Sequence, residues 1–339
     1  MKNNLLFNFS VSYTTGGLKR LYAYSKWFNE RGGTNFIVHH TCSNFIKLYP
    51  NNKYFIVQQS KFSRLFNDCS YLKEILAELN NLDLYYSYGI PIYNKVSKVN
   101  WFHLSSVTPL LALSMDITIF DKIKYFILGI KIRKNLKHAD YISAESNFSL
   151  DLLNVDKKKL FLSVHGSDDE LEYLDQNIED KKENLVVTIG THTYKRIDLV
   201  YSKFLELSEN NKDLRLFIIG EKNNIPSYIL QNKQVEATGS IPRERVIEFL
   251  IKAQYFITAS SMENSYNAAS EGIFLTTESF ISDIAPHREL LKGISYKYSP
   301  IVNSDIELIH VYRKDLSSTN IISWDQVLED FLKHTSALS

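Results

Sequence analysis

Residues 253–290 have the sequence AQYFITASSMENSYNAASEGIFLTTESFISDIAPHREL. Aromatic and β-branched residues predict a buried strand over 255–259, and the residues after it predict a helix over 263–272. Glu263 lies just past this strand, and Glu271 lies eight positions later, inside the expected helix. Both carboxylates can therefore face one ligand, although two glutamates at this spacing are also common on exposed helix faces.

The expected start of this helix would supply hydrogen-bond donors. The backbone N–H groups of Asn264, Ser265 and Tyr266 would lie in its first turn, and such groups bind phosphate or sugar hydroxyls. Carboxylates at the same place would repel a phosphate unless they bind hydroxyl groups instead. A nucleotide sugar carries both phosphates and hydroxyls, so it satisfies both requirements.

A second group of polar residues follows another predicted strand. Residues 190–196 have the sequence GTHTYKR and precede a predicted helix. Gly190, Lys195 and Arg196 are therefore expected at the same edge of the sheet as Glu263. Cations at this edge would neutralise a diphosphate, although a basic pair at a helix start is often only solvated.

Predicted strands and helices alternate along both halves of the chain. Strands are expected over 4–11, 35–40, 54–58, 84–88, 100–104, 185–190, 214–220 and 255–259. Helices are expected over 18–31, 121–138, 197–207, 243–253 and 263–272. Gly16 and Gly17 are expected to form the turn between the first strand and the first helix. This alternation predicts an α/β fold with two Rossmann-like doubly wound domains that face a cleft.

The domain boundaries follow from composition. The stretch SDDELEYLDQNIEDKKEN is acidic and lacks a buried pattern, which is typical of a linker. We expect an N-terminal domain over 1–168, a linker over 169–182, a C-terminal domain over 183–322, and a last helix over 323–339 that packs back on the N-terminal domain.

Composition excludes several classes of protein. Two cysteines without metal-ligand spacing, in 339 residues, disfavour a disulfide framework and a structural zinc site. No long apolar run and no leader-like start are present, so a cytoplasmic protein is expected. No G-x-G-x-x-G motif follows the first strand of either half, which disfavours a dinucleotide oxidoreductase. No G-x-x-x-x-G-K-[ST] motif is present, which disfavours phosphoryl transfer. Nucleic-acid binding is not expected either.

Charge is unevenly distributed along the chain. Residues 1–167 carry 21 Lys and Arg against 11 Asp and Glu, a net charge of +10, whereas the remainder has a net charge of −9. A basic half indicates that this part of the chain faces an anionic surface or ligand. The alternative is that the charges of the two halves drifted apart without a functional reason. Residues 121–138, with six basic side chains among Ile, Phe, Tyr and Leu, predict either an interfacial helix or a helix that covers its own domain.

The order of these motifs resembles a known family. The segment GTHTYKR, then LRLFIIG, then the Glu-x7-Glu pair at Glu263 and Glu271, then SDIAPHREL is similar to the second domain of GT-B-fold retaining glycosyltransferases of the group-1 family. The composition resembles the bacterial type that builds surface polysaccharide, O-antigen or capsule. The resemblance covers about residues 183–336 well and the first half in outline.

The resemblance implies roles for particular residues. Glu263 would contact the donor sugar, Glu271 the ribose hydroxyls, and Lys195 the diphosphate. His103, near the end of a predicted strand, would lie near the reacting carbon, although a lone histidine on a strand is more often a core residue.

Other positions match the family less closely. Gly16 and Gly17 fit its first glycine loop, although such a pair is often only structural. The arginine usual after the strand glycine is replaced by Thr191, so Arg196 or His192 would have to supply the second charge.

The implied activity is transfer of a hexosyl group from a nucleotide sugar to a hydroxyl of a glycan. A lipid would anchor this acceptor glycan at the inner face of an anionic membrane. No metal or other cofactor is expected, because no Asp-x-Asp follows a predicted strand. Two alternatives stay open: a sugar-nucleotide 2-epimerase with the same architecture, and a non-catalytic protein that binds nucleotide sugars.

Overall fold

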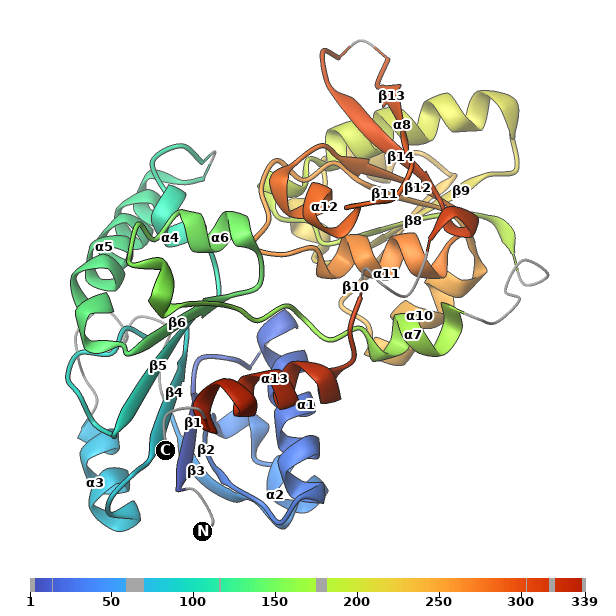
Figure 1. Cartoon of the computed structure of the whole chain (residues 1–339). Helices are drawn as coiled ribbons and strands as arrows, with labels where there is room; N and C mark the ends of the chain where they lie inside the picture. The colour runs from blue at the N-terminus through green and yellow to red at the C-terminus, as the bar shows by residue number, and fades with distance from the viewer. Residues whose placement is uncertain are drawn as a thin grey trace. The chain divides into compact units, whose positions relative to one another are not determined.

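The computed structural model describes residues 4–13, 15–58, 70–115, 117–174, 182–302, 304–316 and 321–336. The chain forms two compact units (Figure 1). The N-terminal unit comprises Met1–Gly166 and Trp324–Ser339, and the C-terminal unit comprises Ser167–Ser323. Each unit has its own sheet with helices around it, so the predicted α/β fold with two doubly wound domains is confirmed.

The sheet of the N-terminal unit has the order β3-β2-β1-β4-β5-β6-β7, and all its described pairs are parallel. Its strands are β1 (Leu5–Phe9), β2 (Asn35–His39), β3 (Lys53–Val57), β4 (Leu84–Tyr88), β5 (Val99–Leu104), β6 (Tyr141–Ala144) and β7 (Leu160–Leu162). The central strands β1 and β4 are buried along their whole length, as parallel strands covered on both faces require. The sequence patterns located the first five of these strands and missed β6 and β7.

The helices of this unit are α1 (Thr15–Glu30), α2 (Phe45–Leu48), α3 (Ser70–Leu79), α4 (Thr108–Leu111), α5 (Ile119–Asn135), α6 (Asn147–Asp151) and α13 (Trp324–Ser336). Helix α13 packs against α1, as Figure 1 shows. Trp324, the first residue of α13, also lies close to Gly166, since a Cβ atom added to Gly166 would lie 2.5 Å from its ring. The C-terminal segment thus completes the core of the unit in which the chain begins.

The expected turn at Gly16 and Gly17 is wrong, because both residues lie in the first turn of α1. The chain turns earlier, where Ser12 N donates a hydrogen bond to Phe9 O over 2.9 Å. A Cβ atom on Gly17 would lie 3.1 Å from the side chains of Ser12 and Tyr88. Glycine therefore permits the helix start to approach the sheet closely, which outweighs its low helix propensity.

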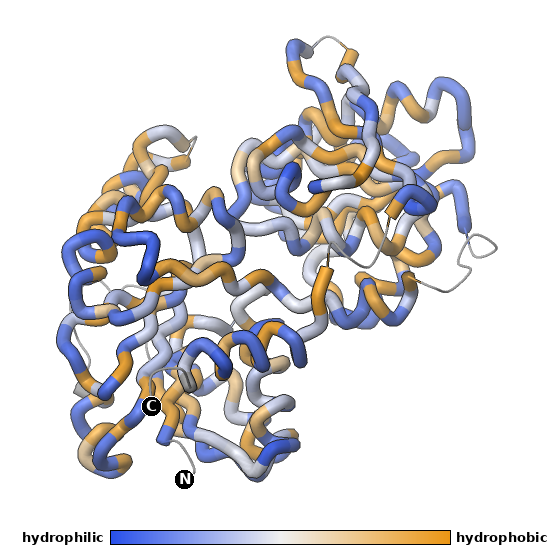
Figure 2. Tube along the Cα trace, viewed as in Figure 1, coloured by the Kyte–Doolittle hydropathy of each residue, from blue (hydrophilic) through white to orange (hydrophobic). Residues whose placement is uncertain are grey.

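The sheet of the C-terminal unit has the order β10-β9-β8-β11-β12-β14-β13. Its strands are β8 (Glu183–Ile189), β9 (Arg215–Ile219), β10 (Val235–Gly239), β11 (Ala253–Thr258), β12 (Glu278–Ser282), β13 (Lys297–Pro300) and β14 (Glu307–Tyr312). Pairs from β10 to β12 are parallel, whereas β14 and β13 are antiparallel additions at one side. Figure 2 shows hydrophobic residues along these strands.

The helices of this unit are α7 (Asp168–Leu174), α8 (Ile197–Asn210), α9 (Ser227–Leu230), α10 (Arg243–Lys252), α11 (Asn267–Leu275) and α12 (Ala285–Leu290). No described helix of either unit is long and apolar enough to cross a membrane.

The structure differs from the linker expected over 169–182. Helix α7 occupies its first part and packs against α11, while residues 175–181 lie outside the described residues. Glu170 is only 1% exposed, and its Oε1 accepts a hydrogen bond from Ser270 Oγ over 3.2 Å. The buried residue of α7 is a glutamate, so an analysis that looks for buried apolar residues does not detect this helix.

The expected helix start at Glu263 is also wrong. Helix α11 begins at Asn267, with Tyr266 as its N-cap, so Asn264, Ser265 and Tyr266 precede the helix. Ser265 Oγ donates a hydrogen bond to Asn267 Oδ1 over 2.9 Å. Short polar side chains of this kind favour a turn over a helix.

Replacing Gly272 by alanine tests the packing of α11 on β11. A Cβ atom on Gly272 would lie 2.1 Å from the ring of Phe256. Gly272→Ala should therefore lower the free energy of unfolding by about 1 to 3 kcal/mol, although alanine is the better helix former by about 1 kcal/mol. Urea denaturation measures the change.

The matched control is Ala268→Gly, the reverse exchange at a half-buried position of the same helix. It should cost no more than about 1 kcal/mol. A Gly272→Ala protein that is more stable than the wild type would contradict the close contact.

Candidate functional site

Two predicted site residues meet at the carboxyl edge of the sheet in the C-terminal unit. Lys195 ends a short 3₁₀ turn, Thr193–Lys195, after β8, and Glu263 follows β11. Lys195 Nζ lies 2.5 Å from Glu263 Oε1, and these side chains are 11% and 19% exposed. Ser261 N donates to Tyr194 O over 2.8 Å, which joins the two loops. The edge therefore presents one cation and one carboxylate in a fixed arrangement.

Gly190 makes room for this lysine. Its φ angle is +89°, a left-handed conformation that favours glycine. A Cβ atom there would lie 3.0 Å from Lys195 Cε. Any larger residue would be strained and would displace the lysine from its position beside Glu263.

Glu271 belongs to a second charged cluster in the same unit. Its Oε2 lies 2.7 Å from Arg243 Nη1, and Arg243 Nη2 lies 2.6 Å from Asp169 Oδ2. Burial lowers the pKa of Arg243, but the charges of Glu271 and Asp169 outweigh this effect and raise it above its ordinary value. Arg243 is thus a permanent cation that joins α7, α10 and α11.

The sequence patterns missed Arg243 as the partner of Glu271 and Asp169 as the second partner of Arg243. Arg243 is simply the first residue of α10, and Asp169 lies in the stretch that resembles a linker. The pair of Arg243 and Asp169 joins residues 74 positions apart, which no local spacing reveals.

Arg196 and His192, the two candidates for a second charge, have partners close by in the sequence. Arg196 has φ +49° and pairs with Asp198, whose Oδ2 lies 3.0 Å from Arg196 Nη2. His192 stacks on the ring of Tyr194 at 5.5 Å. Arg243 contacts the predicted site carboxylate of Glu271.

Thr191 occupies the position where the family usually has arginine. It is buried, and its Oγ1 donates a hydrogen bond to Glu221 O over 2.9 Å. A Cβ atom on Gly220 would lie 2.9 Å from Thr191 Cγ2. This residue therefore packs between two strand ends instead of supplying charge.

His287, in α12 after β12, lies near the Lys195–Glu263 pair. Its Nδ1 donates to Ser282 O over 2.7 Å. Burial lowers the pKa of His287, and the charges of Glu263 and Lys195 act on it in opposite directions. A neutral imidazole with Nδ1 as donor has Nε2 as an acceptor, so His287 adds a hydrogen-bond acceptor near the pair.

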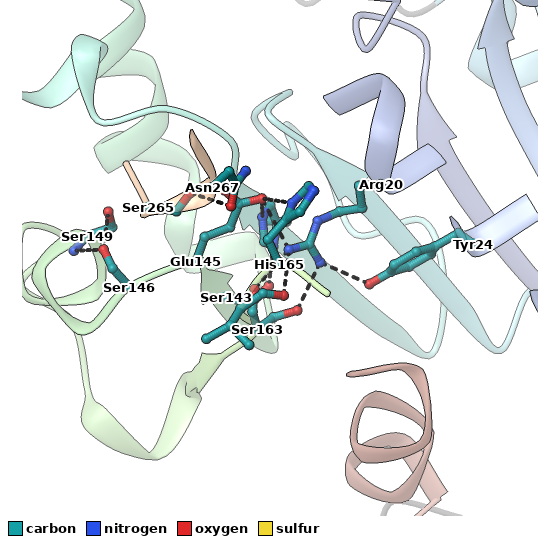
Figure 3. A network of polar contacts seen from close by, with 12 residues as sticks. Arg20, Tyr24, Ser143, Glu145, Ser146, Ser149, Ser163, His165, Ser265 and Asn267 are labelled. Carbon is teal, nitrogen blue, oxygen red and sulfur yellow. Dashed lines mark hydrogen bonds and ion pairs between the residues drawn. The ribbon is translucent and has the colours of Figure 1, made fainter. Parts of the chain in front are cut away.

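The N-terminal unit contains a different charged network, drawn in Figure 3. Arg20, on α1, has no exposed surface, and its guanidinium donates to Tyr24, Ser163 and Glu145. His165 Nδ1 lies 3.6 Å from Glu145 Oε1. Burial raises the pKa of Glu145, but its contacts with two histidines and with Arg20 outweigh this effect and lower it well below its ordinary value. The carboxylate is therefore ionised inside the unit.

His103 belongs to this network. Its Nδ1 is 2.8 Å from Ser143 Oγ, its Nε2 is 3.9 Å from Glu145 Oε1, and its ring stacks on Tyr88 at 4.9 Å. Gly17 also lies close to Tyr88, since a Cβ atom added to Gly17 would lie 3.1 Å from Tyr88 Cε1. Burial lowers the pKa of His103 to about 4, so its imidazole is neutral at pH 7. The role of His103 beside a reacting carbon stays a prediction.

Comparison with known proteins supplies the fold. No protein-family model and no curated protein matches the chain. Similar solved structures include a glycosyltransferase from Rickettsia africae ESF-5, with 15% identity, 99% of each chain covered and a TM-score of 0.63. Sucrose-phosphate synthase from Thermosynechococcus elongatus has 10% identity, with 100% of each chain covered and a TM-score of 0.67.

A third similar structure is Anabaena HepE in complex with UDP and glucose. It has 12% identity, with 85% of this chain and 83% of that chain covered and a TM-score of 0.56. At these identities the likeness shows the fold alone. The chain has the GT-B fold of glycosyltransferases, as the sequence resemblance implied.

Stability should depend on pH through His103 and His165. Burial lowers the pKa of each to about 4, whereas an unfolded chain protonates histidine near pH 6.5. Between these values the unfolded state binds more protons, so the free energy of unfolding should fall with falling pH, by up to about 1.4 kcal/mol per pH unit for each histidine. Urea denaturation at several pH values measures this slope.

The variant His165→Gln removes one of the histidines whose pKa burial lowers, with His103 and His287 remaining, so it should reduce the slope by up to about 1.4 kcal/mol per pH unit. His40→Ala, at an exposed position, should leave it unchanged. A slope equal in wild type and His165→Gln would contradict the assignment.

Proposed function

We propose that the chain is a retaining glycosyltransferase that moves a hexosyl group from a nucleotide sugar to a hydroxyl of a glycan. The observation that carries the proposal is the Lys195–Glu263 pair, with Nζ 2.5 Å from Oε1, at the carboxyl edge of a parallel sheet. Ligands bind at this edge in open α/β sheets. The GT-B fold, shared with a protein solved with UDP and glucose, supports the same conclusion.

In the proposed reaction, negative charge grows on the departing diphosphate. Lys195 would stabilise this charge, because a fixed cation at a place of low water content lowers the barrier more than it tightens ground-state binding. Glu263 would accept hydrogen bonds from donor-sugar hydroxyls while it holds Lys195 in place. The backbone of residues 264–266 borders this position in the sequence and would add contacts to the donor.

Glu271 would bind the ribose of the donor. Arg243 holds Oε2 of this carboxylate at 2.7 Å, which fixes the orientation of the carboxylate toward ribose hydroxyls. Arg243 is therefore a positioning residue, and its link to Asp169 at 2.6 Å keeps it from turning toward the diphosphate. Lys195 is left as the principal cation for the leaving group.

The N-terminal unit would bind the acceptor. Its basic sequence, with a net charge of +10 over residues 1–167, suits an acceptor that carries a lipid diphosphate. Gly16, Gly17 and His103 would border the reacting groups, as the family resemblance implies. The product class, a bacterial surface polysaccharide such as O-antigen or capsule made in the cytoplasm, rests on the sequence resemblance.

A donor panel tests the binding part of the proposal. Ligand-observed NMR should detect binding of one among UDP-, GDP-, dTDP- and CMP-sugars, and Glu271→Ala should weaken it by about 1 to 3 kcal/mol through lost hydrogen bonds. The double variant Glu263→Ala, Glu271→Ala should abolish detectable binding. Arg215→Gln, which breaks an exposed ion pair with Glu236 in the same unit, is the matched control. Equal binding by the double variant would refute the site.

Lys195→Met should lower kcat more than it weakens donor binding. Loss of one stabilising group for a developing charge costs about 100-fold to 1000-fold in rate. Steady-state kinetics and donor titration measure the two effects. Weaker donor binding with kcat unchanged would show that Lys195 acts in ground-state binding alone, and equal losses in the two quantities would contradict the prediction.

The two rival functions predict different products. A 2-epimerase would release an altered nucleotide sugar without any acceptor, and a binding protein would release neither product. A transferase releases nucleoside diphosphate at a rate that depends on the acceptor. Release measured with and without lipid-linked glycan therefore separates the three.

A further inference from the structure

Helix α5 of the N-terminal unit exposes a stripe of large apolar side chains. Ile119, Phe120 and Ile123 are 73%, 66% and 55% exposed. The stripe continues along the helix with Phe126, Ile127 and Ile130, which are also exposed. On a helix with about 3.6 residues per turn these six positions share one side. We call this surface the α5 stripe.

The opposite side of α5 holds the helix to the unit. Leu128, Gly129 and Ile132 are buried. The approach is close enough that a Cβ atom on Gly129 would lie 2.1 Å from Pro109 O of α4. The α5 stripe is therefore an additional apolar surface, beyond what the packing of this helix uses.

Basic side chains border the stripe on both sides. By helix geometry, Lys122 and Arg133 flank one border and Lys124 and Lys131 the other. Asp121, the acidic residue of the first turn, forms an ion pair with Lys124 and accepts a hydrogen bond from Thr118 Oγ1. The stripe and its borders thus carry a net positive charge.

The exposed stripe decides between the two structures that the sequence allowed for this helix. A helix that covered its own domain would bury its Ile and Phe side chains beneath lysine stems. Here the apolar side chains reach the surface, and Figure 2 shows hydrophobic and hydrophilic residues alternating along α5. Large exposed apolar surfaces with polar borders mark interaction sites.

We propose that the α5 stripe docks on an anionic lipid bilayer. Ile and Phe side chains enter the boundary between headgroups and acyl chains, and the bordering Lys and Arg side chains contact headgroup phosphates. A second copy of the chain fits less well, since both borders carry the same charge and would repel their counterparts. The proposal does not depend on the transferase activity, because it concerns only the N-terminal unit's surface.

Vesicle flotation tests the docking with the full chain. We expect the protein to float with vesicles of phosphatidylcholine mixed with phosphatidylglycerol, and more weakly with phosphatidylcholine alone. Added salt should reduce binding to the anionic vesicles, because it screens the basic borders. Absence of flotation with anionic vesicles at low salt would overturn the proposal.

Paired variants locate the contact. Phe120→Ser with Ile123→Ser should lower the vesicle partition coefficient at least about tenfold, because two apolar side chains lose their burial. The matched control is Ile46→Ser with Leu48→Ser, two side chains of α2 that are 48% and 51% exposed; it should partition like the wild type. Equal partitioning of both double variants would overturn the proposal.

Two further measurements keep the result specific. Thermal unfolding should be unchanged in both double variants, since the replaced side chains are exposed. Sedimentation without lipid tests the alternative occupant: a dimer lost in the Phe120→Ser, Ile123→Ser variant, with no vesicle binding by the wild type, would assign the stripe to a second copy. Donor binding measured on the same variants should be unchanged, which separates failure of docking from failure of the proposed activity.

Discussion

Parallel strands can be joined only by connections that cross back over the sheet, so every strand of a parallel sheet delivers its carboxyl end to the same edge. Both units of this protein obey that constraint in their parallel strands. In the C-terminal unit it brings the loops after β8 and β11 together, although Lys195 and Glu263 are 68 positions apart. The proposed site of the C-terminal unit depends on this shared edge.

Charges at these edges are held in pairs. A buried ionised group is costly unless an opposite charge and hydrogen bonds compensate it. Arg243 lies between two carboxylates, and Arg20 lies beside Glu145 and donates to several oxygens. Such pairs keep carboxylates ionised and their side chains oriented. An ionised, oriented carboxylate can accept hydrogen bonds from the hydroxyls of a ligand.

The two units use this principle differently. In the C-terminal unit the pairs are partly exposed, so a ligand can exchange contacts with Lys195 and Glu263. In the N-terminal unit the side chains of Arg20, Glu145 and His103 are buried, so their network fixes the positions of the strand ends.

Sequence patterns located most strands because a strand covered on both faces must be apolar along a short continuous run, as in LLFNF and AQYFIT. They failed at the start of α11, where the side chains of Ser265 and Asn267 bond to each other. They failed again at α7, whose buried position is Glu170. In both places a specific polar contact replaced the pattern that local periodicity can detect.

The sequence by itself determined the fold class, the two-domain organisation in outline, and the identity of Lys195, Glu263 and Glu271 as candidate residues, because residue type and local period suffice for these. Tertiary structure alone decided that Lys195 meets Glu263, that Arg243 holds Glu271, and which side of α5 is exposed. Those facts depend on contacts between distant segments. Such contacts are set by how whole elements pack, and short-range spacing contains no information about them.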